Sequence, residues 1–122
     1  MDPAVRVLIV EDEVLIAMLL TELVEQLGCS VCDVAATEAG AVAMARAYEP
    51  GLIIVDAGLH EGSGVSAMNT ILEQGFVPHI YVTGDKHLVR TLAGQAIVLE
   101  KPFFARDLSN GIERALAAAD GP

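Results

Sequence analysis

Five short apolar runs, rich in β-branched residues, recur along the chain. They cover residues 5–10, 30–35, 52–55, 79–83 and 96–99. Apolar residues in these runs are mostly continuous rather than alternating with polar ones. That pattern is typical of parallel strands that are covered on both faces of a sheet. The chain is therefore predicted to form five buried parallel strands.

Each predicted strand is followed by a stretch with helical periodicity or helix boundary signals. These stretches cover residues 14–27, 38–48, 65–74, 86–92 and 105–118, and the fourth is short and polar. Thr37 is a candidate N-cap for the second helix, Pro50-Gly51 ends it, and Gly75 stops the third. Strand and helix alternate five times, which predicts an α/β fold with a doubly wound parallel sheet and helices on both faces.

The longest apolar run, residues 14–20, follows an acidic triplet and is expected to form a core helix. Met18, Met44 and Met68 occupy helical core spacings and are expected to pack inside. Phe103 and Phe104 are expected to anchor the last helix to the core.

A chain of 122 residues fits a single domain, here predicted to span residues 1–122 with its core at about 5–118. The sequence contains no internal repeat, linker or low-complexity segment. Because it stops soon after the fifth helix, we expect no output domain.

The net charge of the chain argues against some classes of function. The chain has 17 acidic and 7 basic residues, for a net charge of −10. Such a surface repels nucleic-acid phosphates and anionic lipid, so no direct nucleic-acid binding is expected. No apolar run approaches the roughly 20 residues needed to span a bilayer, and Met1-Asp2-Pro3 lacks the cationic start of a secretory signal. We therefore expect no membrane insertion and a cytoplasmic location.

Cys29 and Cys32 form a C-x-x-C pair. A redox pair of this kind lies where a strand opens a helix, whose N-terminus lowers a thiol pKa. Here the pair follows Gly28 and leads into a strand, and no second Cys pair completes a zinc site. Two reduced structural cysteines are the expected interpretation.

Polar residues follow four of the five strands. Glu11 and Asp12 come after the first strand, Asp56 ends the third, Thr83 ends the fourth and Lys101 follows the fifth. In open α/β sheets, ligands bind beyond the carboxyl ends of the strands. We therefore expect these five side chains to meet at one rim of the sheet.

Their chemistry points to phosphoryl transfer. Three carboxylates at one place repel each other unless a cation neutralises them, and Mg²⁺ prefers such oxygen ligands. A carboxylate such as Asp56 can attack phosphorus to give an acyl phosphate. The transferring group carries charge on three oxygens, which the metal, the Lys101 ammonium and the Thr83 hydroxyl could stabilise. Glu13 is instead interpreted as an acid at a helix N-terminus.

These residues give the chain a clear resemblance to the receiver domain of bacterial two-component response regulators. The motifs that carry it are Leu8-Ile9-Val10-Glu11-Asp12-Glu13, Asp56 with Gly64 eight residues later, Val82-Thr83-Gly84, and Lys101-Pro102-Phe103. They occur in this order over nearly the whole chain, from Val5 to about Leu116. Tyr81-Val82-Thr83-Gly84 also looks similar to a stretch in single-domain receivers paired with HWE-family kinases of alphaproteobacteria.

The resemblance implies a flavodoxin-like fold with strand order 2-1-3-4-5 and a phosphoryl group received from a histidine kinase. It implies Mg²⁺ held by Asp12, Asp56 and the backbone carbonyl of Gly58, with Glu11 contributing through water. It also suggests a cis Lys101-Pro102 peptide bond, since proline makes that isomer accessible.

Several positions depart from the family's usual pattern. His60 stands where most members have proline, and Gly58 is smaller than the common asparagine or other polar residue. Asp85 adds a negative charge near the mouth of the site. Val98 lies where many members carry a tyrosine or phenylalanine that moves inward on activation. The last change puts the usual threonine–aromatic switch in doubt, though not phosphorylation itself.

The expected function is therefore phosphorelay signal transduction by a stand-alone receiver, not an enzyme with a diffusible substrate. The implied partners are a sensor histidine kinase or phosphotransfer protein and a downstream protein target, with a homodimer also possible. The target is expected to bind the face formed by the fourth helix, fifth strand and fifth helix, which carries Lys86, His87, Arg90, Val98 and Arg106.

Two other classes of function compete with this one. A phosphorylation-independent interaction module could keep the fold alone. The intact set of acids, hydroxyl and lysine counts against this alternative, whereas the departures at His60 and Val98 leave it open. A magnesium-dependent hydrolase or flavin carrier is disfavoured, because Glu11-Asp12-Glu13 would repel a flavin phosphate. The D-x-D of aspartyl phosphatases is also missing after the first strand.

Overall fold

The computed structural model describes residues 5–120, and their side chains as far as residue 118. Its elements are β1 (Arg6–Val10), α1 (Val14–Gln26), β2 (Ser30–Ala35), α2 (Glu38–Tyr48), β3 (Leu52–Asp56), α3 (Gly64–Leu72), β4 (His79–Thr83), α4 (Lys86–Leu92), β5 (Ile97–Glu100) and α5 (Ala105–Asp120). The predictions that concern Met1-Asp2-Pro3, and both ends of the predicted domain 1–122, fall outside the described residues.

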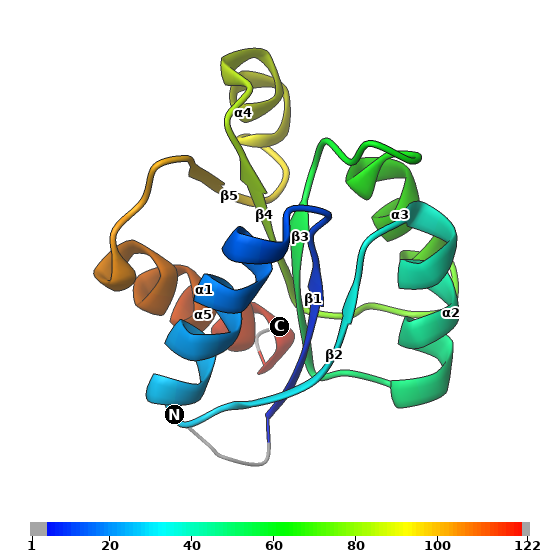
Figure 1. Cartoon of the computed structure of the whole chain (residues 1–122), viewed down its shortest axis with the longest axis horizontal. Coiled ribbons are helices and arrows are strands. Elements are labelled where there is room, and N and C mark those ends of the chain that lie inside the picture. The colour runs from blue at the N-terminus through cyan, green and yellow to red at the C-terminus, as the bar shows by residue number, and fades with distance from the viewer. Residues whose placement is uncertain (1–4, 121–122) are drawn as a thin grey trace.

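The five strands form one parallel sheet in the order β2-β1-β3-β4-β5, which confirms the predicted flavodoxin-like topology. Helices α1 and α5 cover one face, and α2 and α3 cover the other (Figure 1). The sheet reverses its winding direction between β1 and β3. In doubly wound sheets, ligands bind at such a switch point, beyond the carboxyl ends of the strands.

The core has two halves, one on each face of the sheet. All five residues of β3 are buried, and successive residues point to opposite faces. Ile53 and Val55 pack with α2 and α3, whereas Leu52 and Ile54 pack with α1 and α5. Burial on both faces explains why the central strands read as continuous apolar runs.

Element boundaries differ from the predicted ones by one or two residues. The third helix begins at Gly64 and ends at Leu72 instead of covering 65–74, and β5 covers Ile97–Glu100 instead of 96–99. The Thr37 cap is confirmed, because its Oγ1 accepts a hydrogen bond of 3.0 Å from the Gly40 N–H. Cys29 is buried, and the Cys32 thiol donates to the Val7 carbonyl at 3.3 Å.

Helix α1 does not bury its whole apolar run, so the prediction of a core helix over residues 14–20 was wrong for one face. Leu20 is 1% exposed, but Val14, Leu15 and Met18 are 71%, 80% and 62% exposed. A helix that packs on a sheet buries one stripe, and seven consecutive residues turn through more than a full circle. The expected packing role holds for Met68 and, in part, for Met44, but not for Met18.

The two adjacent phenylalanines also behave differently from each other. Phe103 packs on the core, as expected. Phe104 is 69% exposed and lies under the Arg106 guanidinium, 5.4 Å from the ring centroid, so its predicted anchoring role was wrong. Within residues 5–120, the structure has no helix of the length and apolar character needed to cross a membrane.

Candidate functional site

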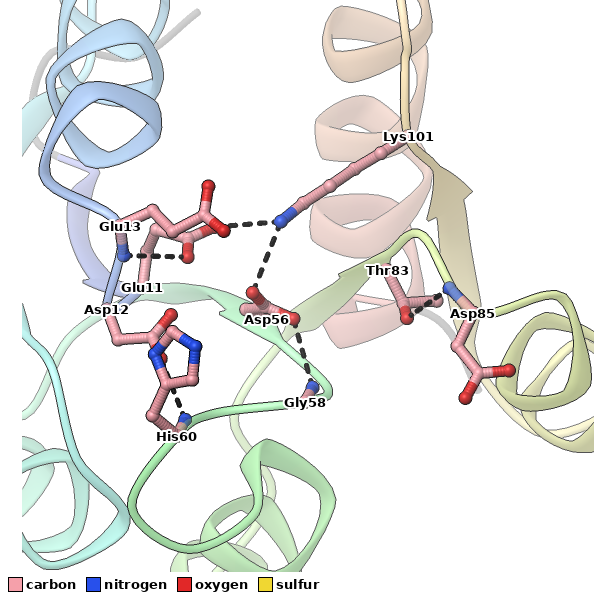
Figure 2. Close-up of polar contacts among 9 residues, drawn as sticks. All are labelled: Glu11, Asp12, Glu13, Asp56, Gly58, His60, Thr83, Asp85 and Lys101. Atoms are coloured by element: carbon pink, nitrogen blue, oxygen red, sulfur yellow. Dashed lines mark hydrogen bonds and ion pairs between the residues drawn. The ribbon is translucent and has the colours of Figure 1, made fainter.

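Side chains from four strand ends meet at one rim of the sheet (Figure 2). Glu11 and Asp12 follow β1, Asp56 is the last residue of β3, Thr83 ends β4, and Lys101 follows β5. The structure thus brings together all five predicted side chains. Strand β2 contributes a main-chain group to this rim: the Ala35 carbonyl accepts a hydrogen bond from the Glu11 N–H at 2.8 Å.

Lys101 links two of the carboxylates. Its Nζ lies 3.2 Å from Glu11 Oε1 and 3.2 Å from Asp56 Oδ2. The peptide bond that follows it, Lys101-Pro102, is cis, as predicted. The main-chain N–H of Lys101 donates to the Thr83 carbonyl at 2.9 Å, which joins the ends of β4 and β5.

The three carboxylates are crowded enough to fit a divalent cation. Glu11, Asp12 and Asp56 each offer an oxygen, and these oxygens lie within 4.8 Å of one another. Glu11 and Asp56 are 2% and 8% exposed, so little water screens them. When all three carboxylates are ionised, the single ammonium leaves an excess of two negative charges, which one Mg²⁺ would balance.

The environment shifts the ionisation of several of these groups. Burial raises the pKa of Glu11 to about 7, and the neighbouring Asp56 carboxylate adds to the increase. Burial would lower the pKa of Lys101, but the carboxylates of Asp56 and Glu11 outweigh it and raise that pKa above its ordinary value. Desolvation opposes ionisation of Asp12 as well, yet hydrogen bonds, above all from the His60 N–H, lower its pKa. Such departures are expected where charged groups are held at close range.

Main-chain groups around β3 hold Asp56 in place. The Gly58 N–H donates to Asp56 Oδ1 at 2.9 Å, while Lys101 contacts Oδ2. Gly64 lies against the same residue, and a Cβ at position 64 would stand 1.9 Å from the Asp56 carbonyl oxygen. The spacing of Asp56 and Gly64 therefore has a steric reason, since only glycine allows helix α3 to start this close to the strand.

Thr83 is 3% exposed, and its Oγ1 accepts the Asp85 N–H at 3.1 Å. A hydroxyl that accepts one bond keeps its proton available for a ligand oxygen. The Asp85 carboxylate, which the sequence marks as an extra charge near the site, caps α4 by accepting the His87 and Leu88 N–H groups. Glu13 is the N-cap residue of α1, but its side chain makes no capping bond.

One contact in the site was missed by the sequence reasoning. Asp12 Oδ2 accepts the His60 main-chain N–H at 2.7 Å and also meets Nδ1 of the His60 ring. The sequence drew attention to position 60 through its departure from proline and as a residue that could modulate the mouth of the site, but it did not indicate a contact with Asp12. The two residues are 48 positions apart, so only the packing of the two loops could reveal the contact.

Fold and site together define a class of protein: parallel α/β domains with an acidic pocket, a hydroxyl and a lysine at the carboxyl ends of the strands. The profile of the response regulator receiver domain matches residues 7–113. The chain belongs to this family.

Individual relatives point the same way. The chain is 41% identical over 119 residues to the phyllosphere-induced regulator PhyR of Methylorubrum extorquens, covering 94% of this chain and 45% of that protein. The solution structure of the PhyR receiver domain from Erythrobacter litoralis matches with a TM-score of 0.85 and 35% identity, covering 97% of this chain and 94% of that one. The anti-anti-sigma factor PhyR from Bartonella quintana matches with a TM-score of 0.84 and 35% identity, covering 96% and 49%. The chain spans about half the length of the curated relatives it matches.

Proposed function

We propose that the chain is a phosphorelay receiver in which Asp56 accepts a phosphoryl group from a histidine kinase or phosphotransfer protein. The observation that carries this proposal is the pairing of Asp56 Oδ2 with Lys101 Nζ at 3.2 Å, inside a pocket where three carboxylate oxygens lie within 4.8 Å. With Mg²⁺ bound, such a pocket could hold both a nucleophilic carboxylate and an incoming phosphoryl group.

In the proposed step, an Asp56 carboxylate oxygen forms a bond to phosphorus. The bond from phosphorus to the donor's imidazole nitrogen breaks, and its electron pair stays on that nitrogen. Lys101 and the Thr83 hydroxyl would bind the phosphoryl oxygens as their charge moves. Mg²⁺ would supply charge neutralisation when bound. Asp12 and Asp56 would hold it, with the Gly58 carbonyl as a further ligand and Glu11 contributing through water.

This role is that of a phosphoacceptor rather than of an enzyme acting on a diffusible substrate. The donor would be a protein, and we expect the exchange in the cytoplasm. The acyl phosphate would act by shifting the population between two states of the domain that differ in partner affinity.

The exposed face of α1 is the surface we propose for the phosphodonor. Val14, Leu15, Met18 and Leu19 are 50% to 80% exposed and follow directly after the acidic triplet at the mouth of the site. They lie at helical spacings i, i+1, i+4 and i+5, so they form one apolar stripe. A helical donor that packs on this stripe would bring its histidine close to Asp56.

Output is proposed to pass through the face of α4, β5 and α5. Lys86 and Arg90 of α4 and Arg106 of α5 are exposed, and Lys86 pairs with Glu100 at the end of β5 at 3.6 Å. The Bartonella relative is described as an anti-anti-sigma factor, and an output of that kind, in which the receiver controls a protein partner, is our preferred interpretation. A homodimer also stays a prediction.

The test is the intact mass of the protein after incubation with acetyl phosphate, with Mg²⁺ or with EDTA. We expect one phosphoryl adduct in the wild type with Mg²⁺, and none with EDTA or in Asp56→Asn. Asp33→Asn, which changes an acid bonded to Tyr48 away from the site, should keep the adduct. If folded wild type gains no adduct from acetyl phosphate or phosphoramidate, the phosphorylation-independent interaction module becomes the better assignment.

A further inference from the structure

The loop between β3 and α3, residues 57–63, is held near Asp56 at both of its ends. At its start, the Gly58 N–H donates to Asp56 Oδ1 at 2.9 Å. At its end, the Gly64 N–H donates to the Ala57 carbonyl at 3.1 Å, which closes the loop. The path of the main chain in between is thus fixed relative to the strand that carries Asp56.

Glu38, the first residue of α2, holds the same loop from the other side. Its Oε1 accepts the Ser63 N–H at 2.9 Å, and its Oε2 accepts the Ser66 hydroxyl at 2.7 Å. Its main-chain N–H donates to the Glu61 carbonyl at 3.2 Å. Gly62 has a φ of 90°, and a Cβ there would stand 2.5 Å from the Glu38 Cβ. Helix α2 therefore supports the loop against sideways movement.

At the middle of this supported loop, His60 reaches across to Asp12. The His60 main-chain N–H donates to Asp12 Oδ2 at 2.7 Å, and the ring Nδ1 meets the same oxygen. The Asp12 side chain is 10% exposed, whereas the His60 side chain is 82% exposed. A proline at position 60 would have no N–H to give. The bond thus depends on a residue type that sets this chain apart from the family's usual pattern.

We propose that His60 is a positioning residue that fixes the Asp12 carboxylate for an incoming divalent cation. The inference rests on the proposed function, because it assumes the cation site at Glu11, Asp12 and Asp56. Without a cation the three carboxylates repel one another, and an unheld Asp12 would turn towards water. A donor that already orients the carboxylate lowers the reorganisation needed to bind the ion, as outer hydrogen bonds to metal ligands do.

The two contacts from His60 contribute unequally. A charge-assisted bond from a main-chain N–H on a supported loop loses little conformational entropy when it forms. The imidazole is mostly exposed, and water competes for such a contact. The N–H of residue 60 is thus the main anchor, and the ring reinforces it.

The experiment is calorimetric titration of the full metal-free chain with MgCl₂. We expect His60→Pro to weaken Mg²⁺ binding by about tenfold or more, within the range known for lost outer-shell contacts. His60→Ala keeps the main-chain N–H, so it should weaken binding by less than His60→Pro does. His60→Asn, which restores a polar side chain, should lie between wild type and His60→Ala. His87→Ala, which removes an exposed histidine on α4, should bind like wild type. Thermal unfolding of each variant without metal verifies that it is folded.

A second measurement avoids the effect of proline on the backbone. In the NMR spectrum of the metal-free wild type, the His60 amide proton should resonate downfield and exchange slowly. Asp12→Ala should shift it upfield and speed its exchange. If wild type binds Mg²⁺ and the His60 variants bind it equally or more tightly, the role of His60 is wrong while the proposed function stands. The same holds if Asp12→Ala leaves the chemical shift and the exchange rate of the His60 amide proton unchanged. If wild type binds no Mg²⁺, the cation site of the proposed function is wrong, and the inference is overturned with it.

Discussion

Individual residues at this site are positioned by main-chain groups from other segments as much as by their own strands. The Gly58 N–H orients Asp56, and the His60 N–H orients Asp12. Helix α3 can start beside Asp56 because position 64 has no side chain. At the residue scale, the site depends on small, close contacts that tolerate little added volume.

Gly64→Ala tests this dependence. The new methyl group would lie 1.9 Å from the Asp56 carbonyl oxygen and 2.8 Å from Val55 Cγ2, so backbone must move. We expect the free energy of unfolding to fall by about 1–3 kcal/mol, as for overpacked sites, and phosphorylation of Asp56 to slow. Urea denaturation and the rate of adduct formation measure the two effects.

Gly94→Ala is the matched control, because nothing lies within 4 Å of a Cβ at that position. It should leave stability nearly unchanged. Equal effects of the two substitutions would contradict the tight approach of α3 to β3.

At the scale of the element, helix α1 carries two different surfaces. Ala17, Leu20 and Val24 face the sheet, and Val14, Leu15, Met18 and Leu19 face outward. Helix α1 packs against the sheet on one side only. It therefore contains more apolar residues than its packing on the sheet requires. Large exposed apolar patches on a small domain commonly mark interaction surfaces.

The same substitution on the two surfaces of α1 should have very different consequences. Leu20→Ala removes a fully buried side chain, so we expect a loss of about 2–5 kcal/mol in the free energy of unfolding. Leu15→Ala should change stability by less than about 0.5 kcal/mol, because this side chain is 80% exposed. Urea denaturation compares them directly. A large loss for Leu15→Ala would mean that this face is covered in solution, for example by a second copy of the chain.

For the whole molecule, the site joins parts of the chain that are far apart in sequence. Glu11 and Lys101 are 90 residues apart in the sequence, yet Lys101 Nζ lies 3.2 Å from Glu11 Oε1. The order of the strands in the sheet brings them together. A cation bound at the site would therefore connect the ends of β1 and β3, and only the folded chain could hold it. Binding should thus stabilise the whole domain by linkage.

Mg²⁺ is therefore expected to raise the midpoint of thermal unfolding. At a Mg²⁺ concentration one hundred times the Kd, the stabilisation should be about 2.7 kcal/mol. Asp12→Asn should lose most of the increase, whereas Glu113→Gln, on the exposed side of α5, should keep it. Differential scanning calorimetry with and without MgCl₂ gives the comparison. An equal increase in wild type and Asp12→Asn would mean that the ion acts elsewhere.

Much of the fold and the positions of the site residues were predictable for a physical reason. The central strands β1, β3 and β4 are buried on both faces and almost wholly apolar, so they stand out in the sequence, whereas the edge strands β2 and β5 are only partly buried. Polar residues at the carboxyl ends of the strands mark the rim of the sheet. Helix limits were less predictable, because end residues such as Glu73 lie in turns that continue the helical path. Met18 and Phe104 were predicted to be packed, but both are exposed. The hydrophobicity of a side chain does not show whether another segment of the chain covers it.

The sequence by itself determined the alternation of strands and helices, the family, and the set of acids, hydroxyl and lysine that could meet at one rim. Those features follow from local periodicity and from the residue types at strand ends. Only the tertiary structure decided that Lys101 contacts both Glu11 and Asp56, that Glu38 and His60 hold the β3–α3 loop and Asp12, and that one face of α1 is left uncovered. These depend on contacts between segments tens of residues apart, whose distances are set by the packing of the whole sheet and its helices.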